Sequence, residues 1–294
     1  MRARSGRMRR ARVHRLADRS FNRMVPNILT LLALCAGMTA MRFAMNGNFV
    51  GAVFAIIVAG IFDGLDGRIA RLLKTTSSFG AELDSLSDFV SFGVAPAAVL
   101  YLWTMSSLHG FGWAIVLFYA VCCALRLARF NIESGNARPA YAAAFFTGVP
   151  APAGAGLVMV PMFLSFEWGD WLFRSPYLNA VTVAGVAVLM ISKVPTFSLK
   201  GVRVPHHRVV PTLLGIGVLA AFVTTAPWPT LTAIGIVYVG SIPLTIRSYY
   251  RMRRAAETRR VEPAEPTDAA ALAPPASAGY PLDEGGAPAS QWRH

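Results

Sequence analysis

Long apolar stretches, each close to 20 residues, recur along most of this chain. Eight are found, at 26–45, 49–72, 84–106, 111–130, 141–164, 177–194, 209–226 and 228–247. A helix of about 20 apolar residues crosses the hydrocarbon core of a bilayer. With 54% hydrophobic residues and a mean hydropathy of +0.47, the composition excludes an ordinary soluble domain. We therefore predict an all-α fold, a polytopic integral membrane helical bundle with about eight transmembrane helices.

Positive charge is concentrated at both ends of the apolar region and in every second loop. Nine arginines precede residue 25, six more lie between Arg247 and Arg260, and the net charge is +13. Loops rich in Lys and Arg stay in the cytoplasm, so we expect a cell (inner) membrane protein with both termini cytoplasmic. The basic clusters fit binding to anionic membrane lipids better than to nucleic acid, because no soluble domain is left to carry a nucleic-acid site.

Three regions follow from this pattern of charge and hydropathy. Residues 1–24 form a basic cytoplasmic arm, residues 25–250 the transmembrane domain, and residues 251–294 a basic segment followed by a disordered Pro/Ala-rich tail. The basic arm is long and the apolar run behind it lacks a small-residue cleavage pattern. We therefore expect that run to remain as the first span rather than to be removed.

Four aspartates lie near the cytoplasmic ends of the second and third expected spans. They belong to the pattern D-x2-D-G-x2-A-R-x8-G-x3-D-x3-D, formed by Asp63, Asp66, Gly67, Ala70, Arg71, Gly80, Asp84 and Asp88. The first aspartate is about 21 Å along its helix, well inside the bilayer. Spacings of three and four residues put each pair on one helix face, and the short connector makes the two helices antiparallel neighbours. All four carboxylates are therefore expected to meet at one inward-facing cavity.

This group of charges indicates a divalent-metal site that handles a phosphate ester. Close carboxylates repel one another unless a cation lies between them, and oxygen ligands favour Mg²⁺ or Mn²⁺. Gly67 and Ala70 are small, so a flat ligand can approach the helix backbone there. Arg71 is placed to hold a phosphate oxygen. Gly60 and Gly64 are spaced for close helix contact.

Two other interpretations of the aspartates remain open from the residues alone. The acids can pair with neighbouring cations at a helix end, without any ligand. They can also line the path of a cation-coupled membrane transporter, since ionisable groups within a membrane mark such paths.

At all eight fixed positions, the aspartate pattern resembles the signature of the CDP-alcohol phosphatidyltransferases. Four further segments resemble the serine-using members of that family, at 25–30, 91–96, 125–131 and 146–152. The resemblance implies an enzyme that transfers the phosphatidyl group of CDP-diacylglycerol to L-serine and releases CMP. It also implies a homodimer and a catalytic transmembrane domain. A sibling reaction with glycerol 3-phosphate or inositol phosphate shares the same metal site and stays open.

The resemblance also implies roles for single residues. Asp63, Asp66 and Asp84 would be metal ligands, and Asp88 would complete a second metal site or act as general base on the serine hydroxyl. Gly67, Ala70, Arg71 and Gly80 would border CDP-diacylglycerol. From their spacing, Arg126 and Arg129 share a face of the fourth span, where either can bind the serine carboxylate. Their alternative role is that of cations reaching from the span to the membrane surface.

Overall fold

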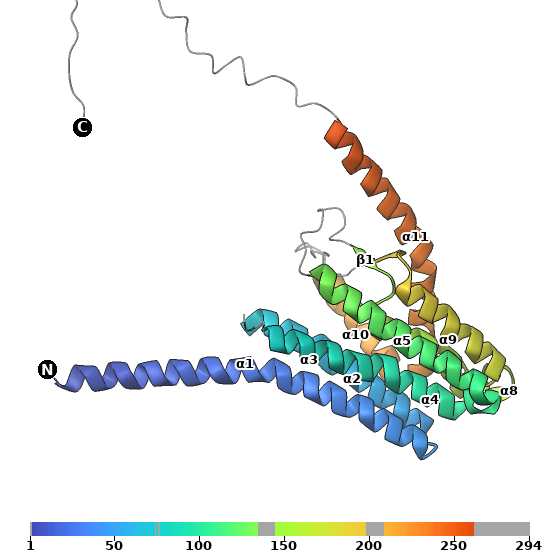
Figure 1. The fold of residues 1–294 in the computed structure, drawn as a ribbon, viewed down its shortest axis with the longest axis horizontal. Coiled ribbons are helices and arrows are strands. Elements are labelled where there is room, and N and C mark those ends of the chain that lie inside the picture. The colour runs from blue at the N-terminus through green and yellow to red at the C-terminus, as the bar shows by residue number, and fades with distance from the viewer. Residues whose placement is uncertain (1, 74, 76, 135–144, 198–208, 262–294) are drawn as a thin grey trace, which may run out of the picture. The chain divides into compact units, whose positions relative to one another are not determined.

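The computed structural model describes residues 2–73, 75, 77–134, 145–197 and 209–261. Almost all of them are helical (Figure 1). The elements, in chain order, are α1 (Arg2–Met45), α2 (Phe49–Leu73), α3 (Ser78–Asp88), η1 (Phe89–Val94), α4 (Ala95–Trp103), η2 (Met105–Leu108), α5 (His109–Ser134), β1 (Phe145–Thr147), α6 (Ala151–Val158), α7 (Val160–Trp168), α8 (Asp170–Phe173), α9 (Pro176–Ile191), β2 (Pro195–Phe197), α10 (Val209–Thr225) and α11 (Pro227–Val261).

Six helical segments are long and apolar enough to cross a membrane. They are Met24–Met45, Phe49–Leu73, Ser78–Trp103, Met105–Glu133, Ala151–Trp168 and Pro227–Met252. The remaining two apolar helices, α9 and α10, have 16 and 17 residues. The all-α polytopic membrane architecture is therefore confirmed, whereas the number of eight crossings stays a prediction. The Pro/Ala-rich tail beyond residue 261 lies outside the described residues.

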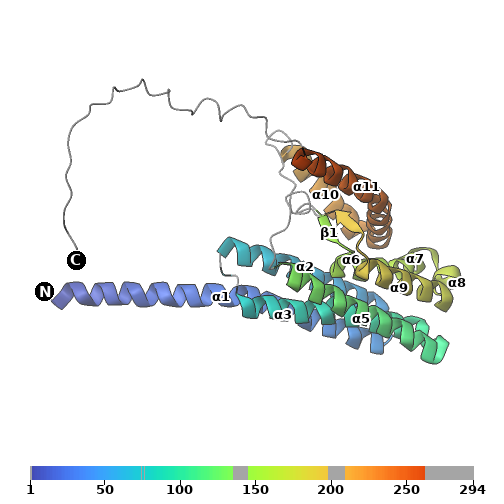
Figure 2. The ribbon, with the colours of Figure 1, turned by 45° about the horizontal axis from the view of Figure 1, so that its top comes forward.

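The C-terminal half of α1 packs along α2 and against α3 and α4, whereas its N-terminal end projects away from the other helices (Figure 2). Hydroxyl groups fasten this contact, since Ser87 Oγ donates to Thr30 O at 3.0 Å and Ser91 Oγ donates to Ala33 O at 3.1 Å. A Cβ at Gly37 would lie 2.9 Å from Ser91 Cα, so only glycine allows this approach. The result is a fixed position of α3 relative to α1.

Directly after Asp88 the helix widens into the π-helical turn η1. A π-turn leaves backbone carbonyls without their usual partners, and such turns occur often at functional sites. The buried Tyr119 hydroxyl donates to Phe92 O at 2.9 Å and satisfies one carbonyl of this turn. The third span was predicted to start at residue 84. It starts at Ser78, where Ser77 Oγ accepts from Gly80 N–H at 3.0 Å and caps the helix.

The predicted fifth span, 141–164, is wrong at its start. Residues Phe145–Thr147 form strand β1, which pairs antiparallel with β2, and the helix begins only at Ala151. Gly148 adopts φ 78°, a conformation that ends any helix or strand there, and Pro150 follows as the cap residue. The sixth span was predicted to reach residue 194, but α9 ends at Ile191 because Ser192 is extended.

Replacing Gly148 is expected to destabilise the protein strongly. A Cβ there would lie only 2.5 Å from Met190 O. The positive φ of this residue adds a second cost for any residue other than glycine. Gly148→Ala should lower the free energy of unfolding by about 2–3 kcal/mol and lower the Tm in detergent by several degrees. Gly169 is a matched control, since it has φ 93° but no atom within 4 Å of a Cβ. An equal Tm loss in Gly169→Ala would contradict the close approach to Met190.

Candidate active site

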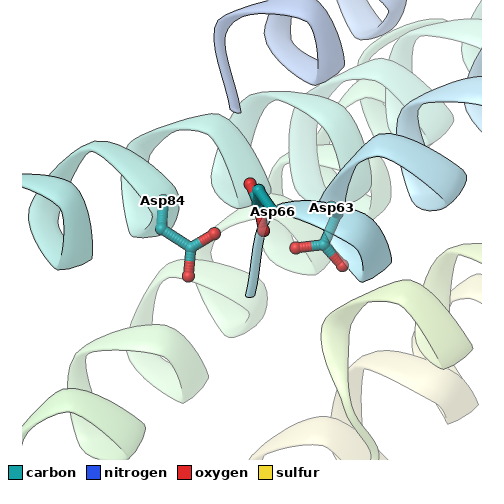
Figure 3. A group of neighbouring side chains, drawn as sticks. All are labelled: Asp63, Asp66 and Asp84. Carbon is teal, nitrogen blue, oxygen red and sulfur yellow. The ribbon is translucent and has the colours of Figure 1, made fainter. Parts of the chain in front are cut away.

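Three of the four predicted aspartates meet between α2 and α3. One carboxylate oxygen from each of Asp63, Asp66 and Asp84 lies within 4.8 Å of the other two. Figure 3 shows the three side chains directed toward one shared space. Asp66 is buried, and the other two are half-buried. The spacing of three residues on α2 and the short connector to α3 together produce this convergence.

The fourth aspartate, Asp88, is not one of the three whose oxygens converge, but it interacts with two of them, Asp63 and Asp84. Its carboxyl group is within hydrogen-bonding range of Asp63. The guanidinium of Arg126, on α5, interacts electrostatically with both of them and lies over the Phe130 ring at 5.6 Å. A cation from a different helix therefore lies within electrostatic range of Asp63 and Asp88, without forming an ion pair with either of these described residues.

The arrangement fits a divalent cation. Oxygens bound to one Mg²⁺ or Ca²⁺ lie at most about twice the ion–oxygen distance apart, which is about 4–5 Å. The separation of up to 4.8 Å among Asp63, Asp66 and Asp84 meets that limit. Three hard oxygen donors also match the ligand preference of Mg²⁺ and Mn²⁺.

The orientation of Asp66 is set by helix α1. Thr30 Oγ1 donates to Asp66 Oδ2 at 2.6 Å, and the threonine side chain is buried. A hydroxyl that donates to one carboxylate oxygen leaves the other directed toward the shared space. Thr30 itself is held by the bond from Ser87 to its carbonyl.

A pocket of about 180 Å³ opens beside Asp66 and Asp84. It contains all four residues that the resemblance assigned to CDP-diacylglycerol, Gly67, Ala70, Arg71 and Gly80. A Cβ at Gly80 would lie 3.1 Å from Asn27 Oδ1 of α1, so glycine lets α3 approach α1 closely here. The pocket wall thus joins α1, α2 and α3.

The two arginines on α5 have different surroundings, although their spacing suggested a shared role. Arg126 lies within electrostatic range of Asp63 and Asp88, whereas Arg129 Nη1 donates to Ile191 O at 2.8 Å, at the end of α9. A cation at a helix C-terminus satisfies an otherwise unpaired carbonyl. The geometry therefore favours Arg126 over Arg129 as a ligand-binding residue.

Sequence reasoning missed the contribution of α1. Thr30, Asn27 and Pro26 all line the pocket, but no role was assigned to them. Their segment, 25–30, had been noted only for its resemblance to the family. Thr30 and Asp66 are 36 residues apart in sequence. Their contact depends on how α1 packs against α2, and no local sequence pattern predicts it.

Comparison with known families shows the family to which this chain belongs. The sequence model of the CDP-alcohol phosphatidyltransferases matches residues 23–192, more than half of the chain. The chain belongs to this family. A second model, CDP-alcohol phosphatidyltransferase 2, matches residues 207–243. The CDP-alcohol phosphatidyltransferases are divalent-metal-dependent enzymes, and the carboxylate group lies inside the matched segment.

Curated relatives named CDP-diacylglycerol–serine O-phosphatidyltransferase are similar to most of the chain. The protein from Mycobacterium bovis is 41% identical over 226 residues, which cover 76% of this chain and 79% of the relative. The one from Helicobacter pylori is 35% identical over 176 residues, 59% of this chain and 73% of the relative. The one from Bacillus subtilis is 34% identical over 184 residues, 63% and 91%.

Proposed function

We propose that this membrane enzyme transfers the phosphatidyl group of CDP-diacylglycerol to L-serine, forming phosphatidylserine and CMP. The names of the relatives support this substrate pair. The observation that carries the proposal is the position of Arg126. Its guanidinium lies within electrostatic range of Asp88 and Asp63, while the pocket lined by Gly67, Ala70 and Arg71 is lined also by Asp66 and Asp84.

The aspartate cluster has a pocket with Arg71 on one side and Arg126 on the other, and these two sides suit the two substrates. The pocket with Arg71 takes the CDP portion, because a guanidinium binds phosphate oxygens in a fork geometry. Arg126 takes the carboxylate of serine through a charge-assisted pair. Serine bound there has its hydroxyl close to Asp88, and the lipid-linked phosphorus lies between the two binding regions.

In the reaction, the serine hydroxyl oxygen forms a bond to the lipid-linked phosphorus as the bond from that phosphorus to the CMP oxygen breaks. The carboxylate of Asp88 receives the hydroxyl proton, as a general base must be within reach of it. Asp63, Asp66 and Asp84 would hold Mg²⁺ or Mn²⁺, and the bound ion would supply neutralisation of charge that develops on the phosphates. The half-buried position of the site keeps bulk water from competing with serine for the phosphorus.

Location follows from charge and from the nature of the substrates. We place the enzyme in the cell (inner) membrane, with both termini and the active site on the cytoplasmic side, since soluble serine and CMP exchange there. The acyl chains stay in the bilayer while the headgroup reaches the carboxylates. A homodimer is proposed by family resemblance.

The test is CMP release from CDP-diacylglycerol by the purified protein in detergent. Serine, glycerol 3-phosphate or inositol phosphate is added in turn, with Mg²⁺, with Mn²⁺, or with a chelator. Release that needs both serine and a divalent ion is the expected result. Release with another acceptor only would refute the proposed acceptor, and undiminished release in excess chelator would refute the metal site.

Removing the Thr30 hydroxyl is expected to weaken metal binding at Asp66. Thr30→Val keeps the shape but loses the 2.6 Å hydrogen bond. Loss of such a supporting contact costs about 10- to 100-fold in metal affinity, so the Mn²⁺ concentration for half-maximal activity should rise by that factor. Direct Mn²⁺ binding, followed by electron paramagnetic resonance, should change in parallel.

Two variants test whether the hydroxyl itself is responsible. Thr30→Ser retains it and should remain near the unmodified enzyme. Thr39 lies on the same helix and donates to Cys35 O at 2.7 Å, so Thr39→Val should leave the Mn²⁺ dependence unchanged. Unaltered Mn²⁺ binding in Thr30→Val would show that the contact does not position Asp66.

A further inference from the structure

An apolar cavity of about 240 Å³ lies between α2, η1, α6, α7 and α11. Its lining includes Ile56 of α2, Phe92 of η1 and Leu231 of α11. Apart from Tyr238, every residue that lines it is apolar or glycine. Walls of this kind favour apolar ligands, as an enclosed apolar cavity of about 150 Å³ that binds benzene illustrates.

Two glycines keep this space open. The sequence suggested that Gly60 serves close helix contact, but a Cβ there would meet only the Phe92 ring, at 3.8 Å. A Cβ at Gly156 would meet no atom within 4 Å. Gly154, on the same helix as Gly156, differs, because its Cβ would lie 2.9 Å from Met190 Sδ. Larger side chains are thus sterically possible at Gly60 and Gly156. Glycine at these two positions keeps the cavity open and is not required for close contact between helices.

The two ends of the cavity differ in chemistry. At one end Phe163 lines the cavity and stacks on Trp228, with ring centroids 6.2 Å apart. At the other end lies Tyr238, whose buried hydroxyl approaches Thr196 without making a hydrogen bond of good geometry among the described residues. Tyr238 also interacts electrostatically with Arg126, the cation beside the carboxylates. The cavity therefore extends from an aromatic cap to Tyr238, which lies within electrostatic range of Arg126.

We propose that this cavity holds part of one acyl chain of the lipid donor during phosphatidyl transfer. The proposal rests on the proposed function, because it assigns the apolar part of CDP-diacylglycerol whose phosphates lie at the carboxylates. Between Leu231 and Tyr238 the cavity follows about 10 Å of helix α11, a length suited to several methylenes. Ile234 borders the cavity and is 45% exposed, so the cavity reaches the outer surface that faces lipid.

Filling the cavity should change which chain lengths are used. The experiment compares serine-dependent CMP release from dioleoyl and dihexanoyl CDP-diacylglycerol in the same mixed micelles. Gly156→Leu should lower kcat/KM for the dioleoyl donor by about tenfold, the effect of losing burial of about two methylenes. The dihexanoyl donor, whose chains are too short to depend on the cavity, should change by less than about twofold. Gly185→Leu is the matched control, because Gly185 is also exposed to open space in a helix but lies outside the cavity.

A second variant fills the cavity from the opposite wall. Ile234→Trp changes a side chain outside the packed core and should produce the same selective loss, even if Gly156→Leu does not fold. Equal losses for both donors in Ile234→Trp, or unchanged use of the dioleoyl donor, would overturn the proposal. The unmodified enzyme provides the separate check on function, since failure to release CMP from either donor with serine would refute the reaction and not the cavity assignment alone.

Discussion

Asp84→Asn is expected to lower CMP release by about three orders of magnitude while the protein still folds and inserts. Asparagine has the same shape but no charge, so the group formed with Asp63 and Asp66 loses one anionic oxygen. A bound divalent ion supplies several kcal/mol of charge stabilisation in the transition state, and about 4 kcal/mol corresponds to a thousandfold in rate. The measurement is CMP release at saturating substrates, with Mn²⁺ binding followed in parallel.

The control for Asp84→Asn lies on the same helix. Glu82 is exposed and is absent from the lining of the pocket, so Glu82→Gln removes one negative charge without touching the site. It should retain nearly full activity and metal affinity. Full activity in Asp84→Asn would remove Asp84 from the metal site. A similar loss in both variants would instead indicate a general effect of charge on α3.

Arg126→Ala is expected to raise the serine concentration needed for half-maximal activity by about 10- to 100-fold. A hydrogen bond to a charged group contributes about 1.5–3 kcal/mol, which gives a factor of that size. The requirement for CDP-diacylglycerol should change much less, because the pocket around Arg71 lies beside Asp66 and Asp84. Arg126→Lys keeps the charge without the planar fork and should give an intermediate serine requirement.

Arg129 provides the comparison. Its guanidinium donates to Ile191 O, so Arg129→Ala should lower the Tm rather than change the serine requirement. Initial rates at varied serine and fixed CDP-diacylglycerol separate the two effects. Equal serine requirements in Arg126→Ala and the unmodified enzyme would return Arg126 to the role of a cation at the membrane surface.

The sequence was sufficient to predict the convergence of three of the four carboxylates, because that part of the site depends on local geometry. Asp63 and Asp66 are one helical turn apart, and a short connector returns the chain to Asp84. Antiparallel neighbours then follow from chain length alone. Apolar length gave the membrane architecture in the same way, although α9 and α10 fall short of 18 residues.

Features that depend on packing between distant segments were not predictable in this way. The Thr30–Asp66 contact and the strand pair β1–β2 each join segments far apart in sequence. The partner of Arg129, Ile191 O, also comes from a distant helix, so spacing alone could not show that Arg126 and Arg129 have different surroundings. Two apolar stretches with the same hydropathy can also differ in backbone, as the start of the fifth predicted span shows. There a strand and a glycine of positive φ replace the expected helix, because the pairing partner lies some 50 residues further along the chain.

Helices α3 and α4 are joined without a break by the π-helical turn η1, which determines how the side chains of α3 are rotated about the helix axis relative to those of α4. In α3, Asp84 and Asp88 face the carboxylate group, while α4 turns Val99 and Leu100 into the core. Each residue advances an α-helix by about 100°, since 3.6 residues complete a turn. The wider turn between the halves allows both orientations in an unbroken rod. An insertion or deletion within Phe89–Val94 would therefore act on the site as a rotation, swinging Asp84 and Asp88 away from Asp63 without removing any of the three.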